Sequence, residues 1–563
     1  MTPKRRRRAR SRGDLERLLA HHGVVAGPRE VVAGPREVVA GPREVELEDD
    51  GRPRPPARRL ALALAEAGPP HAAFGRYLGS RADVFPVSEC LELSAIPDRG
   101  PGRTAEEVDA LLGAELGRPR DEVFPAFQGE PFFVGLYHQS HRALLADGQS
   151  VVVRLRAPWF DGFGGFDGAG GYDPDHALTD LVTVLEGRGA ELGLGYSGAV
   201  PFAELLGDFR AVCLPPRRDL RIQGESLARL RTDAEGLDGI RVPRVFAHLG
   251  SARVLVVETF QGASWDEVTR MPLEAAAGHD LARRLSLAWL QLAISTETLP
   301  IEAEIEVSRD RQLTFTGGVF TGLPAASRPR LWDYLRATAG HFPDRAAASL
   351  LEELEPVPGA DPIELRTRYR QVVPFRDGGW TQTGESVAEY GLQHWRWARA
   401  AGYRTPEPLV GFFRGLFWVA RRGHDVAPET DPVGAGLDGL QWLASFNQWR
   451  QLTAPRQALQ TAEGYFSSLL LLPQKVDRLL ATLEHGDDGG RRTATPGTAD
   501  LHRSEGGAGS SLALVLGMAA SAMLVRSLEG LGESVLWIEG AGIVLFGVLG
   551  LLLLLRAMRG GRR

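Results

Sequence analysis

Alternating apolar and polar positions in the middle of the chain predict a sheet-rich region. The β-branched run QSVVVRL at residues 149–155 follows an Ala-Asp-Gly turn signal at 146–148, which predicts the second strand of a hairpin. Residues 242–262 (VPRVFAHLGSARVLVVETFQG) predict two more strands around a short turn. The segment IEAEIEV at 301–307 alternates strictly, so its three glutamates share one face of a strand.

Helical periodicity surrounds these strands. The alanine-rich segment 59–67 and the segment 105–117 (AEEVDALLGAELG) predict helices before the first hairpin. Two segments rich in aromatic residues and arginine, 394–404 and 409–425, carry their aromatic residues on one side at helical spacing, which favours core helices over a nucleic-acid stacking surface. The order of strands, helix, strands and helical remainder predicts an α+β, protein kinase-like fold of two lobes with an N-terminal helical extension.

The two ends of the chain differ from this globular middle. A basic N-terminal tail leads into three tandem copies of VVAGPRE, residues 24–44, whose Gly-Pro pairs break helices and strand ladders. Near the C-terminus two apolar segments, 511–525 and 535–555, predict a transmembrane helical hairpin. Arginines flank both outer ends of this hairpin, so the positive-inside rule predicts an inner, cytoplasmic-membrane protein with its soluble part on the cytoplasmic side.

The predicted organisation has seven parts. They are a disordered basic tail with the repeats (1–58), the N-terminal helical extension (59–130), a kinase-like small lobe (131–267), a helical large lobe (268–480), a flexible linker (481–509), the transmembrane hairpin (510–556) and a basic tail (557–563). The linker is rich in Gly, Asp, Thr and Ser, a composition that is typical of a flexible tether.

Composition narrows the classes of function. The chain has 563 residues and a formal net charge of -6, so its bulk charge gives no support to a nucleic-acid partner. Its two cysteines, Cys90 and Cys213, form no CxxC pair, which argues against a disulfide framework or a zinc site and favours a reducing compartment. No apolar run follows the N-terminal basic residues, so a secretory signal peptide is not expected.

Several segments resemble the UbiB/AarF (ADCK) family of atypical kinases, membrane-associated proteins linked to isoprenoid quinone (ubiquinone) biosynthesis. LGSRADVFP at 78–86, with Asp98-Arg99 after it, is similar to the extension that precedes the small lobe in this family. Residues 131–143 resemble the family's alanine-rich loop. The residues kept at its end are Gln139, His141, Arg142 and Ala143. The order of segments from about residue 68 to residue 440 carries the resemblance more than any single motif does.

The departures from the family pattern fall on its chemical residues. The resemblance places Arg154 where the family has a strand lysine that holds phosphates, and Gln223 where it has the helix glutamate that orients this lysine. The family's catalytic loop is expected at 296–303, which is TETLPIEA here, and its Asp-Phe-Gly metal site at 316–318, which is TGG. The Lys-x-Gly-Gln signature of the extension becomes AFGR at 73–76.

These changes predict a pseudokinase. Phosphoryl transfer depends on positioning and on a metal that is held by an Asn and an Asp, and Ala303 and Thr316 stand in those places. We therefore expect no catalytic residue, no metal ligand and no cofactor, with ATP as the open alternative. The residues expected to line the degenerate nucleotide cleft are Arg154, Gln223, Gln139 and His141. The bulky residues predicted to fill that space are Phe132, Phe133 and Leu136.

Two other features have alternative interpretations. Glu302, Glu304 and Glu306 either bind a divalent ion or form the solvated acidic face of a half-buried strand, and the second interpretation is favoured. The glycine-rich segment 161–173 matches neither standard spacing of a phosphate-binding loop, so it is predicted to be a flexible insertion rather than a dinucleotide site.

The predicted function is binding or scaffolding at the membrane without turnover. The partners implied by the resemblance are the membrane, a lipid or quinone precursor, and biosynthetic enzymes. One alternative is an atypical kinase or ATPase that uses Arg154 with Glu302 or Glu304. The other is a structural tether whose hairpin helices form a homo-oligomer through small residues such as Gly540 and Gly542.

Overall fold

A computed structural model describes residues 11–25, 54–161, 173–198, 200–237, 239–371 and 386–440. The contacts within the chain divide the protein into two compact units, residues 1–458 and 459–563. The second unit lies wholly outside the described residues. The predicted linker (481–509), hairpin (510–556) and C-terminal tail (557–563) therefore stay predictions. Within the described ranges, no helix combines the length and the apolar character needed to cross a membrane.

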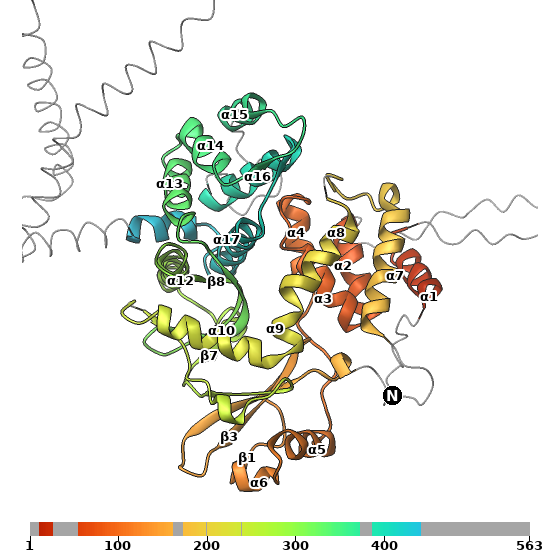
Figure 1. The fold of residues 1–563 in the computed structure, drawn as a ribbon, viewed down its shortest axis with the longest axis vertical. Helices are drawn as coiled ribbons and strands as arrows, with labels where there is room; N and C mark the ends of the chain where they lie inside the picture. The colour runs from red at the N-terminus through yellow and green to blue at the C-terminus, as the bar shows by residue number, and fades with distance from the viewer. Residues whose placement is uncertain are drawn as a thin grey trace, which may run out of the picture. The chain divides into compact units, whose positions relative to one another are not determined.

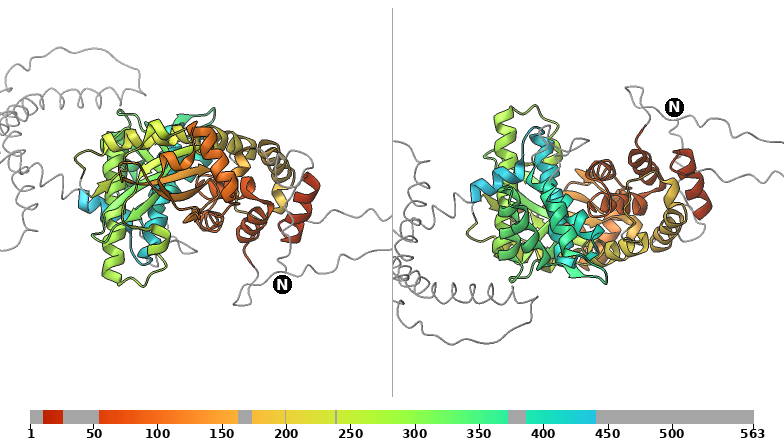
Figure 2. Two further views of the ribbon diagram at one scale, coloured as in Figure 1. Left: turned by 90° about the horizontal axis from the view of Figure 1, so that it is seen from below. Right: turned by 90° about the horizontal axis from the view of Figure 1, so that it is seen from above.

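The N-terminal part is a group of packed helices (Figure 1). It contains α1 (Arg12–His21), α2 (Pro56–Ala67), α3 (Pro69–Leu78) and α4 (Val87–Ser94). Two helices from later in the chain, α7 (Pro174–Gly187) and α8 (Phe202–Asp208), pack on this group, as both views in Figure 2 also show. The segment predicted as the small lobe thus contributes two helices to the extension, because their buried leucines complete its core.

Helix α1 lies within the tail that was predicted to be disordered. The Ser11 hydroxyl caps it by accepting a hydrogen bond from the Asp14 backbone nitrogen at 3.2 Å. Leu15 and Leu19, one turn apart, are buried against α2 and α7. The prediction of disorder is wrong for this stretch, because a capped helix with an apolar side can dock even when the flanking sequence is basic and repetitive.

A buried ion pair lies within the N-terminal extension, just after α3. The Arg81 guanidinium donates to both carboxylate oxygens of Asp83 at 2.9 Å each, and both side chains are almost fully buried. Arg81 also pairs with Asp208 at the end of α8 at 2.9 Å. These contacts join the segment after α3 to α8, which follows it by more than a hundred residues in the chain.

The first sheet has five strands. They are β1 (Ala126–Phe127), β2 (Phe133–Val134), β3 (His138–Leu144), β4 (Ser150–Arg156) and β6 (Val254–Glu258). The order is β1-β3-β4-β6 with β2 beside β3, and all pairings are antiparallel. The predicted hairpin at 149–155 is therefore confirmed. The prediction of two strands in 242–262 is only half right, because Val245 makes a single bridge to Val257 and a 3-10 turn (Ala247–Leu249) follows it.

One face of this sheet packs on α5 (Ala105–Leu116) and α6 (Arg120–Val123). The helix predicted at 105–117 is confirmed, and it begins with a capping box formed by Thr104 and Glu107. Valine and leucine side chains of β4 fill the space beneath it. The buried members on β4 are Val151, Val153 and Leu155.

The second sheet is built on a long hairpin. Strand β8 (Thr298–Val307) pairs antiparallel with β9 (Leu313–Gly322), β7 (Ala263–Ser264) lies beside β8, and β5 (Ile240–Arg241) runs parallel to β9. The predicted alternation in 301–307 is confirmed. The residues of its buried side are Ile301, Ala303, Ile305 and Val307.

Helices make up the rest of the described chain. They are α9 (Pro215–Arg218), α10 (Leu220–Asp233), α11 (Trp265–Val268), α12 (Ala275–Ser295), α13 (Arg328–Ala339), α14 (Pro343–Leu351), α15 (Pro362–Arg370), α16 (Val387–Ala400) and α17 (Glu407–Val426), with a small pair of strands, β10 (Glu355–Pro356) and β11 (Tyr403–Arg404). The aromatic residues of α16 and α17 are core residues as predicted. Trp395, for example, stacks on Phe413 with ring centroids 5.0 Å apart.

Candidate functional site

Arg154 connects the two sheets. It lies on β4, is only 5% exposed, and donates from Nη1 to the backbone oxygen of Thr316 on β9 at 2.8 Å. Its Nη2 forms an ion pair with Glu304 of β8 at 2.8 Å. Both ends of the guanidinium fork are thus bound by the protein's own atoms, where the family's lysine is expected to hold phosphates.

Gln223 reaches the same part of β9 from another direction. It is buried on α10, and its Nε2 donates to the backbone oxygen of Gly318 at 3.4 Å. Arg154 and Gln223 therefore converge on the segment where the resemblance places a metal site. The carboxylate that pairs with Arg154 comes from β8 instead of this helix, a substitution that the family pattern could not indicate.

Gln139 and His141 lie on the opposite face of the first sheet from Arg154. Gln139 is directly opposite Leu155 in the strand register, and Leu155 belongs to the core beneath α5 and α6. Gln139 and His141 hydrogen-bond to each other, with 2.9 Å between the two Nε2 atoms. His141 Nδ1 contacts the backbone oxygen of Gln128 at 2.8 Å, and burial lowers the pKa of this histidine. The structure thus divides the four predicted cleft residues into two pairs.

Glycines let the Arg154 side chain lie against β9. A Cβ atom at Gly317 would stand 2.1 Å from Arg154 Nη1 and 2.9 Å from Glu304 Oε2. Gly318 has a φ of 128° and would place a Cβ 2.1 Å from the backbone oxygen of Glu302. These close approaches explain why the segment Thr316-Gly317-Gly318 has small residues at its last two positions.

The region expected to hold the catalytic loop is a strand. Helix α12 ends at Ser295 and β8 begins at Thr298, so only two residues separate them. From Thr298 onward the chain pairs with β9, with Thr298 opposite Gly322 and Ala303 opposite Gly318. The backbone between helix and strand is therefore too short to form a loop that could present an acid and a metal ligand.

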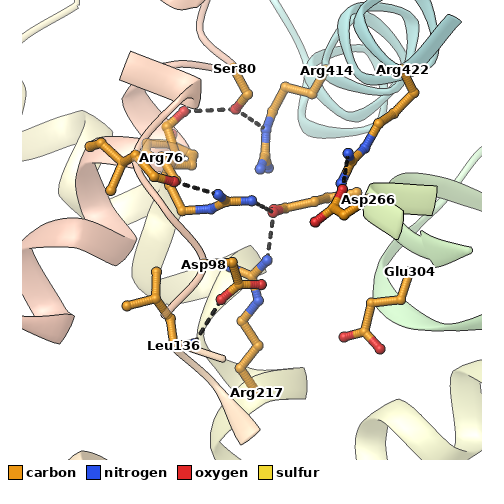
Figure 3. Close-up of polar contacts among 12 residues, drawn as sticks. Arg76, Ser80, Asp98, Leu136, Arg217, Asp266, Glu304, Arg414 and Arg422 are labelled. Atoms are coloured by element: carbon orange, nitrogen blue, oxygen red, sulfur yellow. Dashed lines mark hydrogen bonds and ion pairs between the residues drawn. The ribbon is translucent and has the colours of Figure 1, made fainter. Parts of the chain in front are cut away.

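Several arginines act on Glu302, and Figure 3 shows three of them, Arg76, Arg217 and Arg414, pointing toward one another. Its carboxylate pairs with Arg217 at 2.6 Å and with Arg76 of α3 at 3.5 Å. Burial alone would raise the pKa of Glu302, but the charges of Arg217, Arg76 and Arg414 lower it to about 2. The predicted half-buried strand is confirmed, but its acidic face is only partly solvated, because Glu302 and Glu304 pair with arginines from distant parts of the chain.

The arginines around Glu302 come from separate elements. Arg217 of α9 lies over the Tyr137 ring at 3.6 Å, and Arg76 Nη1 donates to the backbone oxygen of Ile96 at 2.7 Å. Arg414 of α17 donates from Nε to the hydroxyl of Ser80 at 2.9 Å. Farther along α17, Arg422 pairs with Asp266 at 2.6 Å.

Glu306, the third glutamate of the face, stays outside these ion pairs, and burial raises its pKa. Over the part of the chain that the structure describes, no group of three or more His, Cys, Asp or Glu side chains is arranged to hold a metal ion. The divalent-ion interpretation therefore gains no support from the described residues.

The three bulky residues predicted to fill the cleft have different positions. Leu136 is buried, and its backbone nitrogen donates to Asp98 Oδ1 at 2.7 Å. The ring of Phe133 lies 5.3 Å from that of His138, whose Nδ1 is 3.7 Å from the Glu304 carboxylate. Phe132 is exposed, so the prediction that it fills the cleft is wrong.

No family model matches this chain. Among curated proteins it is 22% identical over 455 residues to the chloroplast protein Activity of bc1 Complex Kinase 7 of Arabidopsis thaliana, which covers 79% of this chain and 63% of that protein. It is 30% identical over 204 residues to a probable protein kinase UbiB of Pseudomonas putida, which covers 36% of this chain and 35% of that protein. The chain thus matches less than two thirds of the length of these two relatives.

A solved structure, the complex of Rv3197 with erythromycin from Mycobacterium tuberculosis, aligns with a TM-score of 0.36 at 15% identity. The alignment covers 59% of this chain and 85% of that one.

Proposed function

Because the chain belongs to the UbiB/AarF family of atypical kinase-like proteins, we propose that it is a pseudokinase that binds a ligand or a partner without transferring phosphate. The observation that carries the proposal is the direct passage from α12 into β8. A kinase needs a loop at this point to present its catalytic acid and the amide that holds a metal ion.

The contacts of Arg154 support the same conclusion. A cation that holds nucleotide phosphates must have free donors aimed at them. Arg154 instead uses one terminal nitrogen on Thr316 and the other on Glu304. Binding ATP there would require breaking this ion pair, and we therefore propose no nucleotide cofactor.

The place and partners of the protein are part of the proposal. We propose that the predicted hairpin at 510–556 anchors the chain in the inner, cytoplasmic membrane, with the kinase-like part on the cytoplasmic side. The membrane, a lipid or isoprenoid quinone precursor, and the enzymes of its biosynthesis are the partners that the family resemblance suggests. The names of the relatives, which refer to kinases, support only the kinase-like part of this proposal.

Nucleotide hydrolysis by the full chain in detergent tests the proposal. We expect no magnesium-dependent release of phosphate from ATP, and no difference between the wild type and Arg154→Ala. Magnesium-dependent hydrolysis that Arg154→Ala abolishes would instead establish the enzyme alternative. Deleting residues 511–563 distinguishes the tether alternative from the proposed ligand-binding function. A tether is expected to lose all self-association in this variant, whereas a ligand-binding protein keeps its fold and its ligand.

A further inference from the structure

Three arginines meet at one carboxylate on the second turn of α12. Asp280 accepts hydrogen bonds from Arg284 Nε at 2.8 Å and from Arg283 Nη2 at 3.1 Å. Arg311 Nη1 donates to the same carboxylate at 3.2 Å. Arg283 and Arg284 belong to α12, whereas Arg311 lies in the turn that joins β8 to β9. We name Arg283, Arg284 and Arg311 the arginine triad, since one side chain holds all three together.

The charge of the arginine triad is only partly neutralised. Burial raises the pKa of Asp280, but hydrogen bonds from the three arginines lower it below its ordinary value, so the carboxylate is ionised at neutral pH. One negative charge therefore faces three positive ones. The three arginine side chains are 41%, 41% and 49% exposed, so their charge is accessible from solvent. In the turn itself, the exposed Arg309 and Asp310 carry opposite charges and offset each other.

Arg311 reaches the triad from a backbone conformation that favours glycine. Its φ is 60°, in the left-handed region, and its backbone nitrogen donates to the Ser308 oxygen at 2.9 Å. Glycine would adopt this conformation without strain, but it could not form the ion pair with Asp280. The arginine at this position thus adds a positive charge to the surface at a cost in backbone strain.

The described chain ends beside the arginine triad. A Cβ atom built on Gly439 would lie 3.6 Å from Arg283 Nη1 and 3.6 Å from Leu287 Cδ2 of α12. The described residues stop at 440, and the predicted hairpin at 510–556 follows later in the chain. The triad therefore lies where the chain continues toward its predicted membrane anchor.

Exposed apolar residues precede α12 in the chain. Met271 is 52% exposed and Leu273 is 39% exposed. Helix α12 begins at Ala275, so Asp280 follows Leu273 within about two helical turns. Apolar side chains that enter the headgroup region, together with arginines that pair with anionic headgroups, are typical of proteins that bind a membrane surface.

We propose that the arginine triad and the residues before α12 form a surface that binds anionic phospholipid. Guanidinium groups pair with phosphate and carboxylate oxygens, and the headgroup of phosphatidylserine offers both. Each arginine near an anionic surface strengthens binding roughly fivefold. The inference rests on the proposed function, because it names the face by which a membrane-anchored binding protein lies against its membrane.

Fluorescence quenching by labelled lipids tests this surface on the full chain. A fluorophore is attached to His279→Cys, because His279 is exposed and adjacent to Asp280 in the chain. Spin-labelled phosphatidylcholine in bicelles then quenches a fluorophore that lies near the headgroups. Ile363→Cys is the control position, since Ile363 is 73% exposed on α15, which Figure 1 shows apart from α12. The native Cys90 and Cys213 are buried, so we expect them to stay unlabelled.

We expect phosphatidylserine in the bicelles to increase quenching at residue 279 and to leave quenching at residue 363 unchanged. High ionic strength should reverse the increase, since salt screens exposed charges. In a titration with phosphatidylserine, the triple variant Arg283→Gln/Arg284→Gln/Arg311→Gln should show an association constant lower by about tenfold or more. Arg311→Gln alone is the second variant, for use if the triple substitution prevents folding.

The matched control replaces three exposed arginines of α14 and α15 by glutamine. They are Arg345, Arg368 and Arg370, and this variant should bind like the wild type. Equal quenching at residue 279 with and without phosphatidylserine would overturn the surface. So would an increase that survives in both triad variants or that the control variant loses to the same extent. The proposed pseudokinase would still stand in those cases, because ATP hydrolysis tests it separately.

Discussion

Arg154 on β4 and Glu304 on β8 form an ion pair 2.8 Å long between two sheets that share no strand. We expect Glu304→Gln to lower the free energy of unfolding by about 1–2 kcal/mol, because it leaves a buried guanidinium without its carboxylate. This loss is smaller than the roughly 3–5 kcal/mol typical of breaking a fully buried pair, since the Glu304 side chain is 37% exposed. Urea denaturation measures the change.

The control for this prediction is Asp333→Asn, which removes the partner of the exposed Arg345. That change should stay within about 0.5 kcal/mol. Equal effects of the two substitutions would mean that the pair between the sheets contributes no more than a surface contact.

Gly317 is expected to tolerate no side chain. Gly317→Ala would place a methyl group 2.1 Å from Arg154 Nη1, so the guanidinium or the strand must move. Overpacking of this kind costs about 1–3 kcal/mol. Gly322→Ala, on the same strand, meets nothing within 4 Å and should be close to neutral. The two thermal midpoints should therefore separate clearly, and coinciding midpoints would contradict the close approach seen here.

Acid should remove the contribution of Glu302. The folded protein holds its pKa at about 2, against an ordinary value of 4.5, so the ionised carboxylate stabilises the fold at pH values above 4.5. This stabilisation, of the order of 2 kcal/mol after allowance for partial exposure, is lost as the pH falls from 4.5 towards 2.

Unfolding free energies of the wild type and Glu302→Gln across that range measure the effect. The difference between them should be largest above pH 4.5 and should shrink as the pH falls. A difference that does not change with pH would show that the charges of Arg76 and Arg217 do not act on this carboxylate.

Among the carboxylates of the extension, we expect substitution of the buried Asp83 to cause the largest loss of stability. Asp83→Asn weakens both hydrogen bonds from Arg81 and leaves that guanidinium buried, at a cost of about 3 kcal/mol. Asp344→Asn breaks the pair with Arg370, in which both side chains are 61% exposed, and should change stability by less than about 0.5 kcal/mol. Chemical denaturation of both variants compares a buried pair with an exposed one.

Local patterns predicted much of this fold. The run at 149–155 and the alternation at 301–307 both form the strands they indicate, because period two and β-branched residues leave few alternatives. For the segment at 242–262, the same reasoning predicted two strands and was only half right. A 3-10 turn interrupts its first half, although its valines have high strand propensity.

The site was harder to predict than the fold. Alternation shows that Glu302 and Glu304 share a face, but it cannot show what covers that face. The covering arginines belong to α3, α9 and β4, and only folding brings these elements together. Likewise the family pattern grouped Gln139 with Arg154, whereas strand register places them on opposite faces of one sheet.

If the protein is the pseudokinase proposed above, the two-residue connection between α12 and β8 limits any attempt to introduce catalysis. Activity lost through single substitutions can be regained by reversing them. Here the polypeptide between helix and strand would first have to become longer, so reversion requires inserted codons and a rebuilt ladder with β9. Under the proposed function, an engineer who grafts an aspartate and an asparagine onto residues 296–303 should obtain a less stable strand and no kinase.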